Sequence, residues 1–169
     1  GGNLTLSTPL LTGAQKSIMN YTAGGALAVT VPTGLAQSAA TSTISGAEID
    51  LTGNSVAIAS TILLPSGKLV VNATNDIAIG GSGRIDLSGQ PSMIQKATVY
   101  GFGGTAIFNS SQGGFTQAAG SVIDVSATNA SAGRSASAPA AERSRSAAAS
   151  RAAPPATTPA ATQRHRREH

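Results

Sequence analysis

One stretch of the sequence, Ile49-Asp50-Leu51-Thr52-Gly53, returns as Ile85-Asp86-Leu87-Ser88-Gly89 and again as Ile123-Asp124-Val125-Ser126-Ala127. The three copies begin 36 and 38 residues apart. Each copy places two apolar residues around one polar residue, with a small residue behind them, which is typical of a short strand that ends in a turn. Recurrence at a nearly fixed spacing is typical of proteins built from stacked repeats. The phrase therefore predicts a solenoid.

Short apolar segments of the same kind fill the sequence up to about Ser126. Several of them alternate with a period of two, which places one kind of side chain on one face of a strand. Gly- and Pro-rich turn signals separate them, and no segment keeps a helical period with caps, so we expect essentially no helix. The expected strands are Leu4–Leu6, Ala26–Val31, Glu48–Leu51, Ser55–Ala59, Lys68–Asn72, Asp76–Ile79, Arg84–Leu87, Ala106–Phe108 and Ser121–Val125.

Two topologies compete for these strands. An antiparallel sandwich would join them by tight hairpins, for which Asn-Gly and Asp-Gly are the strongest signals, and neither dipeptide occurs. A right-handed parallel β-helix with coils of roughly 18–20 residues would make each spacing of the repeated phrase equal to two coils. We therefore expect an all-β, right-handed parallel β-helix of about six to seven coils over residues 1–127. Residues 100–117 are less regular and predict one coil with an extruded loop.

The composition fits a thin solenoid core better than a thick globular one. Aromatic residues make up 3% and charged residues 11% of the chain, against about 25% charged in a typical domain. Stacked coils need only Ile, Leu and Val from successive turns to fill their interior. No stretch approaches the roughly 20 apolar residues that a membrane-spanning helix requires. The chain opens without Met and without a secretory signal, which indicates an internal piece of a longer protein.

Two longer stretches resemble a known family. They are Gly2-Asn3-Leu4-Thr5-Leu6-Ser7-Thr8-Pro9-Leu10-Leu11-Thr12-Gly13, and the run from Leu63 to Ile79 followed by Gly83-Arg84-Ile85-Asp86-Leu87-Ser88-Gly89. Residues 1–127 are similar in repeat style to the filamentous haemagglutinin-type adhesins of Gram-negative bacteria. The resemblance implies a shaft fragment of a secreted, outer-membrane-associated virulence protein. It also implies an outer-membrane two-partner secretion transporter as the partner of the full-length protein, with host-cell surface glycans or receptors as further candidate partners.

The sequence changes character in residues 128–169, which are rich in Ala, Ser, Arg and Pro. Residues 1–133 hold four basic and five acidic side chains, whereas residues 134–169 hold seven Arg and two Glu. One interpretation is a disordered, low-complexity tail. The other is a frameshift near residues 128–133, because synonymous codons allow the shifted frame to encode further repeat-like text, and the coding DNA would decide. The tail lacks the interleaved aromatic residues that stack on bases, so we expect no nucleic-acid binding.

The repeated aspartates are the first candidates for chemistry. Asp50, Asp86 and Asp124 are expected to point outward and to lie two coils apart, about 9–10 Å. That is too far for a retaining carboxyl pair and at or beyond the limit for an inverting pair. We therefore interpret them as solvated structural carboxylates.

Other motifs give no site. We expect the side chains of Asn54, Asn72 and Asn75 to stack or to cap turns. Pro65-Ser66-Gly67-Lys68-Leu69 lacks the pattern of a phosphate loop. Both histidines, His165 and His169, lie in the tail. The sequence predicts no catalytic, cofactor-binding or metal-binding residues and no cofactor. The alternatives are a β-helical carbohydrate-active enzyme, an autotransporter passenger fragment and a β-sandwich binding module.

Overall fold

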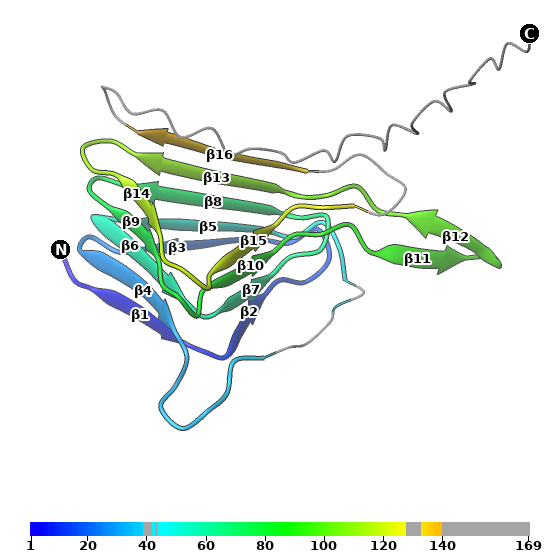
Figure 1. The fold of residues 1–169 in the computed structure, drawn as a ribbon, viewed down its shortest axis with the longest axis horizontal. Helices are drawn as coiled ribbons and strands as arrows, with labels where there is room; N and C mark the ends of the chain where they lie inside the picture. The colour runs from blue at the N-terminus through cyan, green and yellow to red at the C-terminus, as the bar shows by residue number, and fades with distance from the viewer. Residues whose placement is uncertain (39–41, 43, 128–132, 140–169) are drawn as a thin grey trace, which may run out of the picture.

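The computed structural model describes residues 1–38, 42, 44–127 and 133–139. These residues form sixteen strands and no helix (Figure 1). Strands pair in parallel in three sheets, and one two-stranded antiparallel hairpin projects from them. The expected all-β class, its parallel pairing and the lack of helix in this part of the chain are confirmed.

Each strand of the stack belongs to one of three parallel sheets. Sheet A contains β1 (Leu4–Ser7), β4 (Ala26–Thr30), β6 (Ser55–Ala59), β9 (Ile77–Ile79) and β14 (Phe115–Gln117). Sheet B contains β2 (Leu10–Thr12), β7 (Thr61–Leu63), β10 (Arg84–Asp86) and β15 (Val122–Asp124). Sheet C contains β3 (Ile18–Thr22), β5 (Glu48–Gly53), β8 (Lys68–Ala73), β13 (Thr105–Ser110) and β16 (Arg134–Pro139). The hairpin consists of β11 (Pro91–Ile94) and β12 (Ala97–Tyr100).

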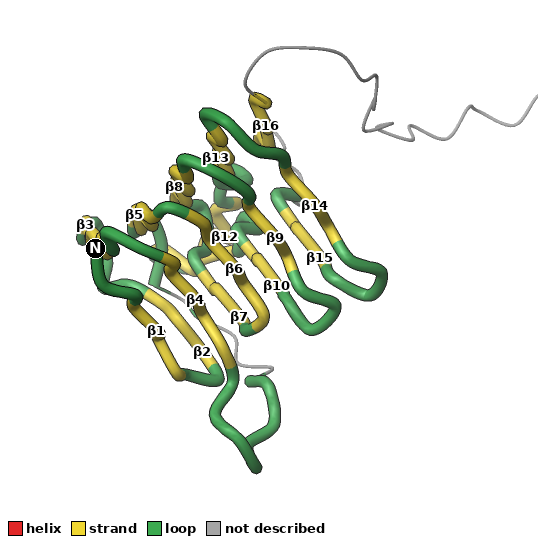
Figure 2. Tube along the Cα trace, turned by 90° about the vertical axis from the view of Figure 1, so that its left-hand side faces the viewer, coloured by secondary structure: helices red, strands yellow, loops and turns green. Residues whose placement is uncertain are grey.

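The chain visits sheets A, B and C in turn, so that successive coils stack on one another (Figure 2). Coils 1, 3 and 5 place one strand in every sheet. Coil 2 consists of β4 and β5 alone, and coil 4 contains β9, β10 and β13 with the hairpin inserted before β13. The described residues thus form five coils, fewer than the six to seven expected, because coils 2 and 4 carry long insertions.

Aligned aliphatic side chains fill the interior of the stack. On β5, Ile49 and Leu51 are buried while Asp50 between them faces outward. Leu69 and Val71 of β8 lie beside them in register. Burying one such side chain stabilises the fold by about 1.5–3 kcal/mol. The largest fully buried side chains are Leu27, Ile49, Leu51, Ile58, Ile62, Leu64, Leu69, Ile77, Ile79, Ile85, Leu87 and Val29.

The repeated phrase does not mark every second coil, and that interpretation was wrong. Its first copy lies on β5 of sheet C, whereas the second and third copies lie on β10 and β15 of sheet B. Ile85 pairs with Ile123, and Asp86 with Asp124, on adjacent coils. Their 38-residue spacing is one coil lengthened by the hairpin. The extruded segment expected within residues 100–117 lies instead at residues 91–100.

The connection between β4 and β5 contributes no strand to sheet B and lies against the outer face of β7. We call its described residues, 31–38, 42 and 44–47, the strap. The Oγ1 atom of Thr61 donates a hydrogen bond to the carbonyl oxygen of Ser38 at 3.1 Å. Thr61 and Leu63 face outward by alternation with Ile62, yet both are only 3% exposed. Because coil 2 contributes no strand to sheet B, β2 of coil 1 pairs directly with β7 of coil 3.

The start of the presumed tail is ordered into the sheet. Strand β16 pairs in parallel with β13 along its whole length, from Arg134 opposite Thr105 to Pro139 opposite Ser110. The expectation of disorder from residue 128 onward is therefore wrong for residues 134–139, because the free edge of β13 offers backbone hydrogen bonds to any extended segment. Residues 128–132 and 140–169 lie outside the described part of the chain.

Asparagine side chains link neighbouring coils on the outside of the stack. The Nδ2 atom of Asn109 donates to Oδ1 of Asn72 at 2.9 Å, and Nδ2 of Asn75 donates to Oδ1 of Asn54 at 3.1 Å. The stacking expected for these residues is present. Each hydrogen bond joins one coil to the next.

Replacing Asn72 by alanine is expected to lower the free energy of unfolding by about 0.5–1.5 kcal/mol, because the hydrogen bond to Asn109 is lost. Urea unfolding followed by circular dichroism measures this change. Asn20→Ala is the matched control, since Asn20 faces outward from the same sheet and makes no side-chain hydrogen bond with the described residues. An equal loss in both variants would contradict a role for the ladder.

Candidate functional site

The β11–β12 hairpin is the most distinct surface feature of the described chain. It projects sideways from the stack where the chain passes from sheet B to sheet C (Figure 1). Its turn residues Gln95 and Lys96 have φ angles of 45° and 68°. Two successive positive φ angles are typical of the type I′ turn, which matches the twist of a two-residue hairpin. The turn lacks Asn and Gly, so the usual sequence signal of a two-residue hairpin is absent here.

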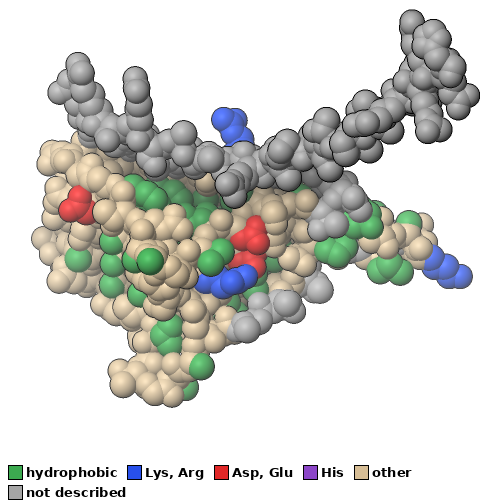
Figure 3. Space-filling view, in the orientation of Figure 1, with side chains coloured by type: hydrophobic (Ala, Val, Ile, Leu, Met, Phe, Trp, Pro, Cys, Tyr) green, Lys and Arg blue, Asp and Glu red, His purple; other side chains and the backbone are tan. Residues whose placement is uncertain are grey.

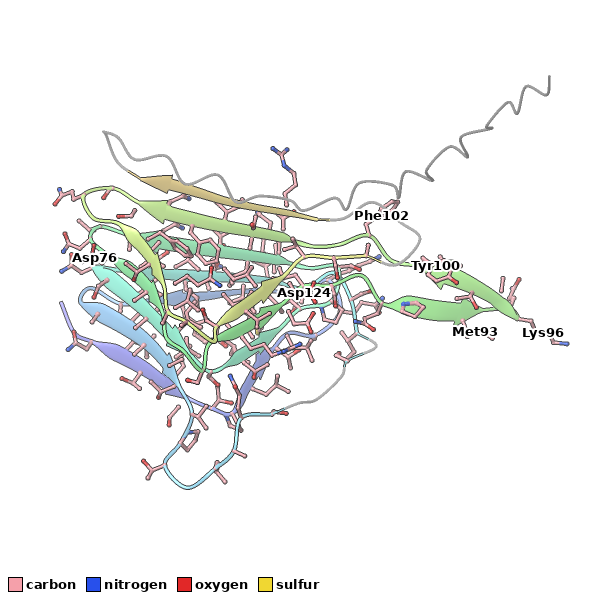
Figure 4. All side chains as sticks on the ribbon, in the orientation of Figure 1. Asp76, Met93, Lys96, Tyr100, Phe102 and Asp124 are labelled. Atoms are coloured by element: carbon pink, nitrogen blue, oxygen red, sulfur yellow. The ribbon has the colours of Figure 1, made fainter. Side chains whose placement is uncertain are left out.

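One face of the hairpin carries exposed apolar side chains. Pro91 lies opposite Tyr100, and Met93 lies opposite Thr98, so these four residues share a face. Met93 is 72% exposed and Tyr100 is 38% exposed. Phe102 follows at the base of the hairpin and is 66% exposed, and Lys96 lies at the tip (Figure 4). Exposed apolar groups gathered on a projecting element are typical of an interaction surface.

Tight glycine contacts fix the base of the hairpin. The chain enters the hairpin through Gly89, where an added Cβ would overlap the carbonyl oxygen of Gly101. It leaves through Gly104, where an added Cβ would overlap the carbonyl oxygen of Gly67 and lie 2.7 Å from Cβ of Leu87. Only glycine permits such close passage of backbones. The hairpin is therefore anchored at a defined place on the stack.

Two carboxylates form the second feature. Asp86 and Asp124 lie side by side on sheet B, one strand spacing of about 4.8 Å apart. The distance of two coils expected between them is therefore wrong, because the hairpin accounts for the intervening residues. The Nη2 atom of Arg84 lies 3.8 Å from Oδ2 of Asp86. In Figure 3 acidic and basic side chains gather near the middle of this face.

Both carboxylates make turn hydrogen bonds of the same kind. Oδ1 of Asp86 accepts from the backbone nitrogen of Ser88 at 3.1 Å and from its hydroxyl at 2.7 Å. Oδ1 of Asp124 accepts from the backbone nitrogen of Ser126 at 2.9 Å. These bonds close an Asx turn at the end of each strand. The repeated Asp-X-Ser pattern thus has a structural use.

The remaining acidic residues of the body are spread over other faces. Asp50 faces outward on sheet C, and its Oδ1 atom is buried without a hydrogen-bond partner among the described residues. Asp76 accepts a hydrogen bond from the backbone nitrogen of Gly114 at 2.8 Å. The three repeated aspartates therefore do not form one row, since only Asp86 and Asp124 come together.

A single ion pair joins coils 2 and 3 on sheet C. Nζ of Lys68 lies 2.5 Å from Oε1 of Glu48. The hydrogen bond to Glu48 raises the pKa of Lys68 above its ordinary value of 10.5. Both side chains are partly exposed, so the ion pair contributes little to the free energy of unfolding.

The pH dependence of this pair has a defined sign. Because the pKa of Lys68 is higher in the folded than in the unfolded state, its stabilising effect is complete below pH 10.5 and is lost as the pH rises above that value. Glu48→Gln is expected to remove this contribution to the decrease in folding stability at alkaline pH. Urea midpoints measured below and above pH 10.5 for both proteins test it, and an identical alkaline loss would contradict it.

Comparison with protein-family models, with curated proteins and with solved structures finds no match to the chain. Within the described residues, no group of three or more His, Cys, Asp or Glu side chains could hold a metal ion. No helix with the length and apolar character of a membrane span occurs in that same part of the chain. His165 and His169 lie outside it.

Proposed function

We propose that this chain is a structural segment of a secreted bacterial surface adhesin, a right-handed parallel β-helix of the filamentous haemagglutinin type. The observation that supports it is the in-register stack of five coils, in which each coil pairs with the next through its parallel strands in sheets A and C, while sheet B continues past coil 2 by pairing β2 with β7. Such a stack is stabilised by nearest-neighbour contacts along one axis, which suits a stiff spacer. The full-length protein would then be exported through an outer-membrane two-partner secretion transporter.

Cell-surface labelling tests this function. Antibodies raised against the purified chain are expected to label intact cells of the source bacterium, and deletion of an outer-membrane transporter gene next to the coding gene is expected to abolish the labelling. Labelling only after permeabilisation of the cells would overturn the proposal. Host-cell glycans and receptors are candidate partners of the same full-length protein.

A second candidate, a carbohydrate-active enzyme, has one observation in its favour. Asp86 and Asp124 lie on adjacent strands, and retaining glycosidases use carboxyl groups about 5–5.5 Å apart. The Asx-turn bonds of both carboxylates favour the structural role. Release of reducing ends from polysaccharide substrates separates the two functions. Activity lost in Asp124→Asn would establish the enzyme, whereas the spacer predicts no activity in either protein.

A further inference from the structure

The hairpin leaves several of its apolar side chains uncovered. A two-stranded hairpin is marginally stable in water without a third strand or a packed face. Met93 is 72% exposed and Val99, on the opposite face, is 47% exposed. Both long edges of the hairpin are also unpaired within the described residues. These features indicate a surface that is completed by a partner.

The hairpin has a defined charge. Residues 91–100 contain Lys96 and no acidic residue. Lys96 lies at the far tip, whereas Asp124 lies back on the body of the stack (Figure 4). The tip therefore points away from Asp124 of its own chain.

A complementary surface lies on coil 4, which carries the hairpin, and on coil 5 next to it. Arg84, Asp86, Val122 and Asp124 face outward from β10 and β15, and none of them is fully buried; we call them the sheet-B patch. Its two carboxylates exceed its one guanidinium, so the patch carries a net negative charge. Val122 adds an apolar side chain that is 39% exposed. A cationic, apolar hairpin and an anionic, partly apolar patch are complementary.

We propose that the hairpin of one copy docks on the sheet-B patch of a second copy, with Lys96 beside Asp86 and Asp124 of that copy. Each strand of the hairpin is about 13 Å long, which is enough to cross β10 and β15. Because each copy carries both the hairpin and the patch, a two-fold axis between the copies makes the contact twice, as in an isologous dimer. An interface of this size is small, so the dimer is expected to be weak, with a Kd in about the micromolar range.

A lipid surface fits the same hairpin less well. Anionic membranes attract segments with several basic residues, at about 1 kcal/mol for each, and the hairpin has one. That one cation lies at the tip, which would enter the membrane first. The second copy offers both a counter-charge and an apolar contact, so it is the favoured occupant.

Sedimentation of the purified 169-residue chain over a range of concentrations tests the proposal. We expect a reversible monomer–dimer equilibrium that weakens with added salt. Lys96→Glu is expected to weaken it about tenfold, since attraction becomes repulsion. Asp124→Lys is expected to have a similar effect, and the chain with both reversals is expected to recover most of the affinity. Lys16→Glu, the same charge change at an exposed site on coil 1, is the matched control.

Three results would overturn the proposal. The first is a monomer at every concentration. The second is association that Lys96→Glu leaves unchanged, which would indicate pairing through the open edges of the stack. The third is binding to phosphatidylserine-containing vesicles without dimer formation. None of these outcomes depends on where the protein is located, so they test the hairpin separately from the proposed function.

Discussion

Leu51→Ala is expected to lower the free energy of unfolding by about 2–5 kcal/mol. Leu51 is fully buried at the centre of β5, where it pairs with Tyr21 on coil 1 and with Val71 on coil 3. Removal of the Leu51 side chain leaves a cavity. The neighbouring strands on both sides cannot move in to fill it, because their backbone hydrogen bonds hold them in place. Because domains are stable by only about 5–15 kcal/mol, such a loss is expected to broaden or abolish cooperative unfolding.

The matched control is Leu35→Ala. Leu35 lies in the strap and is 58% exposed, so its truncation is expected to change stability by less than about 0.5 kcal/mol. Urea unfolding of the three proteins, followed by circular dichroism in the far ultraviolet, gives both differences. Similar losses at the two leucines would contradict the aligned core and place Leu51 near the surface.

Gly104→Ala is the second large effect, with an expected loss of about 3 kcal/mol. The added methyl group would overlap the backbone of Gly67 and press on Leu87. Neither neighbour can move freely, because backbone hydrogen bonds hold both. The nitrogen of Gly104 donates to the carbonyl oxygen of Leu87 at 2.7 Å, and the nitrogen of Thr105 donates to the carbonyl oxygen of Gly67 at 2.9 Å. The coil must therefore separate from its neighbour at this corner.

Gly114→Ala serves as the comparison for Gly104. An added Cβ at Gly114 would meet its nearest neighbour, the side chain of Asp76, at 4.0 Å. This substitution is expected to be neutral or to stabilise by up to about 1 kcal/mol, since alanine restricts the unfolded chain. Thermal unfolding of both variants decides the matter. A Gly104 variant as stable as the Gly114 variant would show that the hairpin base is loosely packed.

The local strand pattern was readable from the sequence, because it depends on side chains that alternate along a few residues. All nine expected strands coincide with observed ones, and seven others were missed. Among the missed strands, β7 is buried on both sides since the strap covers it, so it shows no alternation. Strand β16 consists of Arg, Ser, Ala and Pro and has no aliphatic side chain larger than Ala, so only its backbone pairing with β13 reveals it.

The assignment of strands to sheets was not readable. An inward-outward-inward triplet such as Ile49-Asp50-Leu51 looks the same on any face of a solenoid, so a nearly equal spacing between copies does not imply that they lie in the same sheet. The number of residues from one coil to the next is irregular. Paired residues are 20 positions apart between Glu48 and Lys68, but 37 positions apart between Lys68 and Thr105. Backbone hydrogen bonds align the coils regardless of how many residues loop out between them. The approach of Asp86 to Asp124 could therefore be found only in three dimensions.

The absent sheet-B strand of coil 2 has a mechanical consequence. In the described part of the chain, sheets A and C contain five strands each, whereas sheet B contains four. One side of the stack is therefore shorter by one strand spacing, about 4.8 Å, and the axis must curve toward that side. A longer array that skipped a strand at intervals would trace an arc or a superhelix, so the positions of such skips would determine the direction in which its far end points.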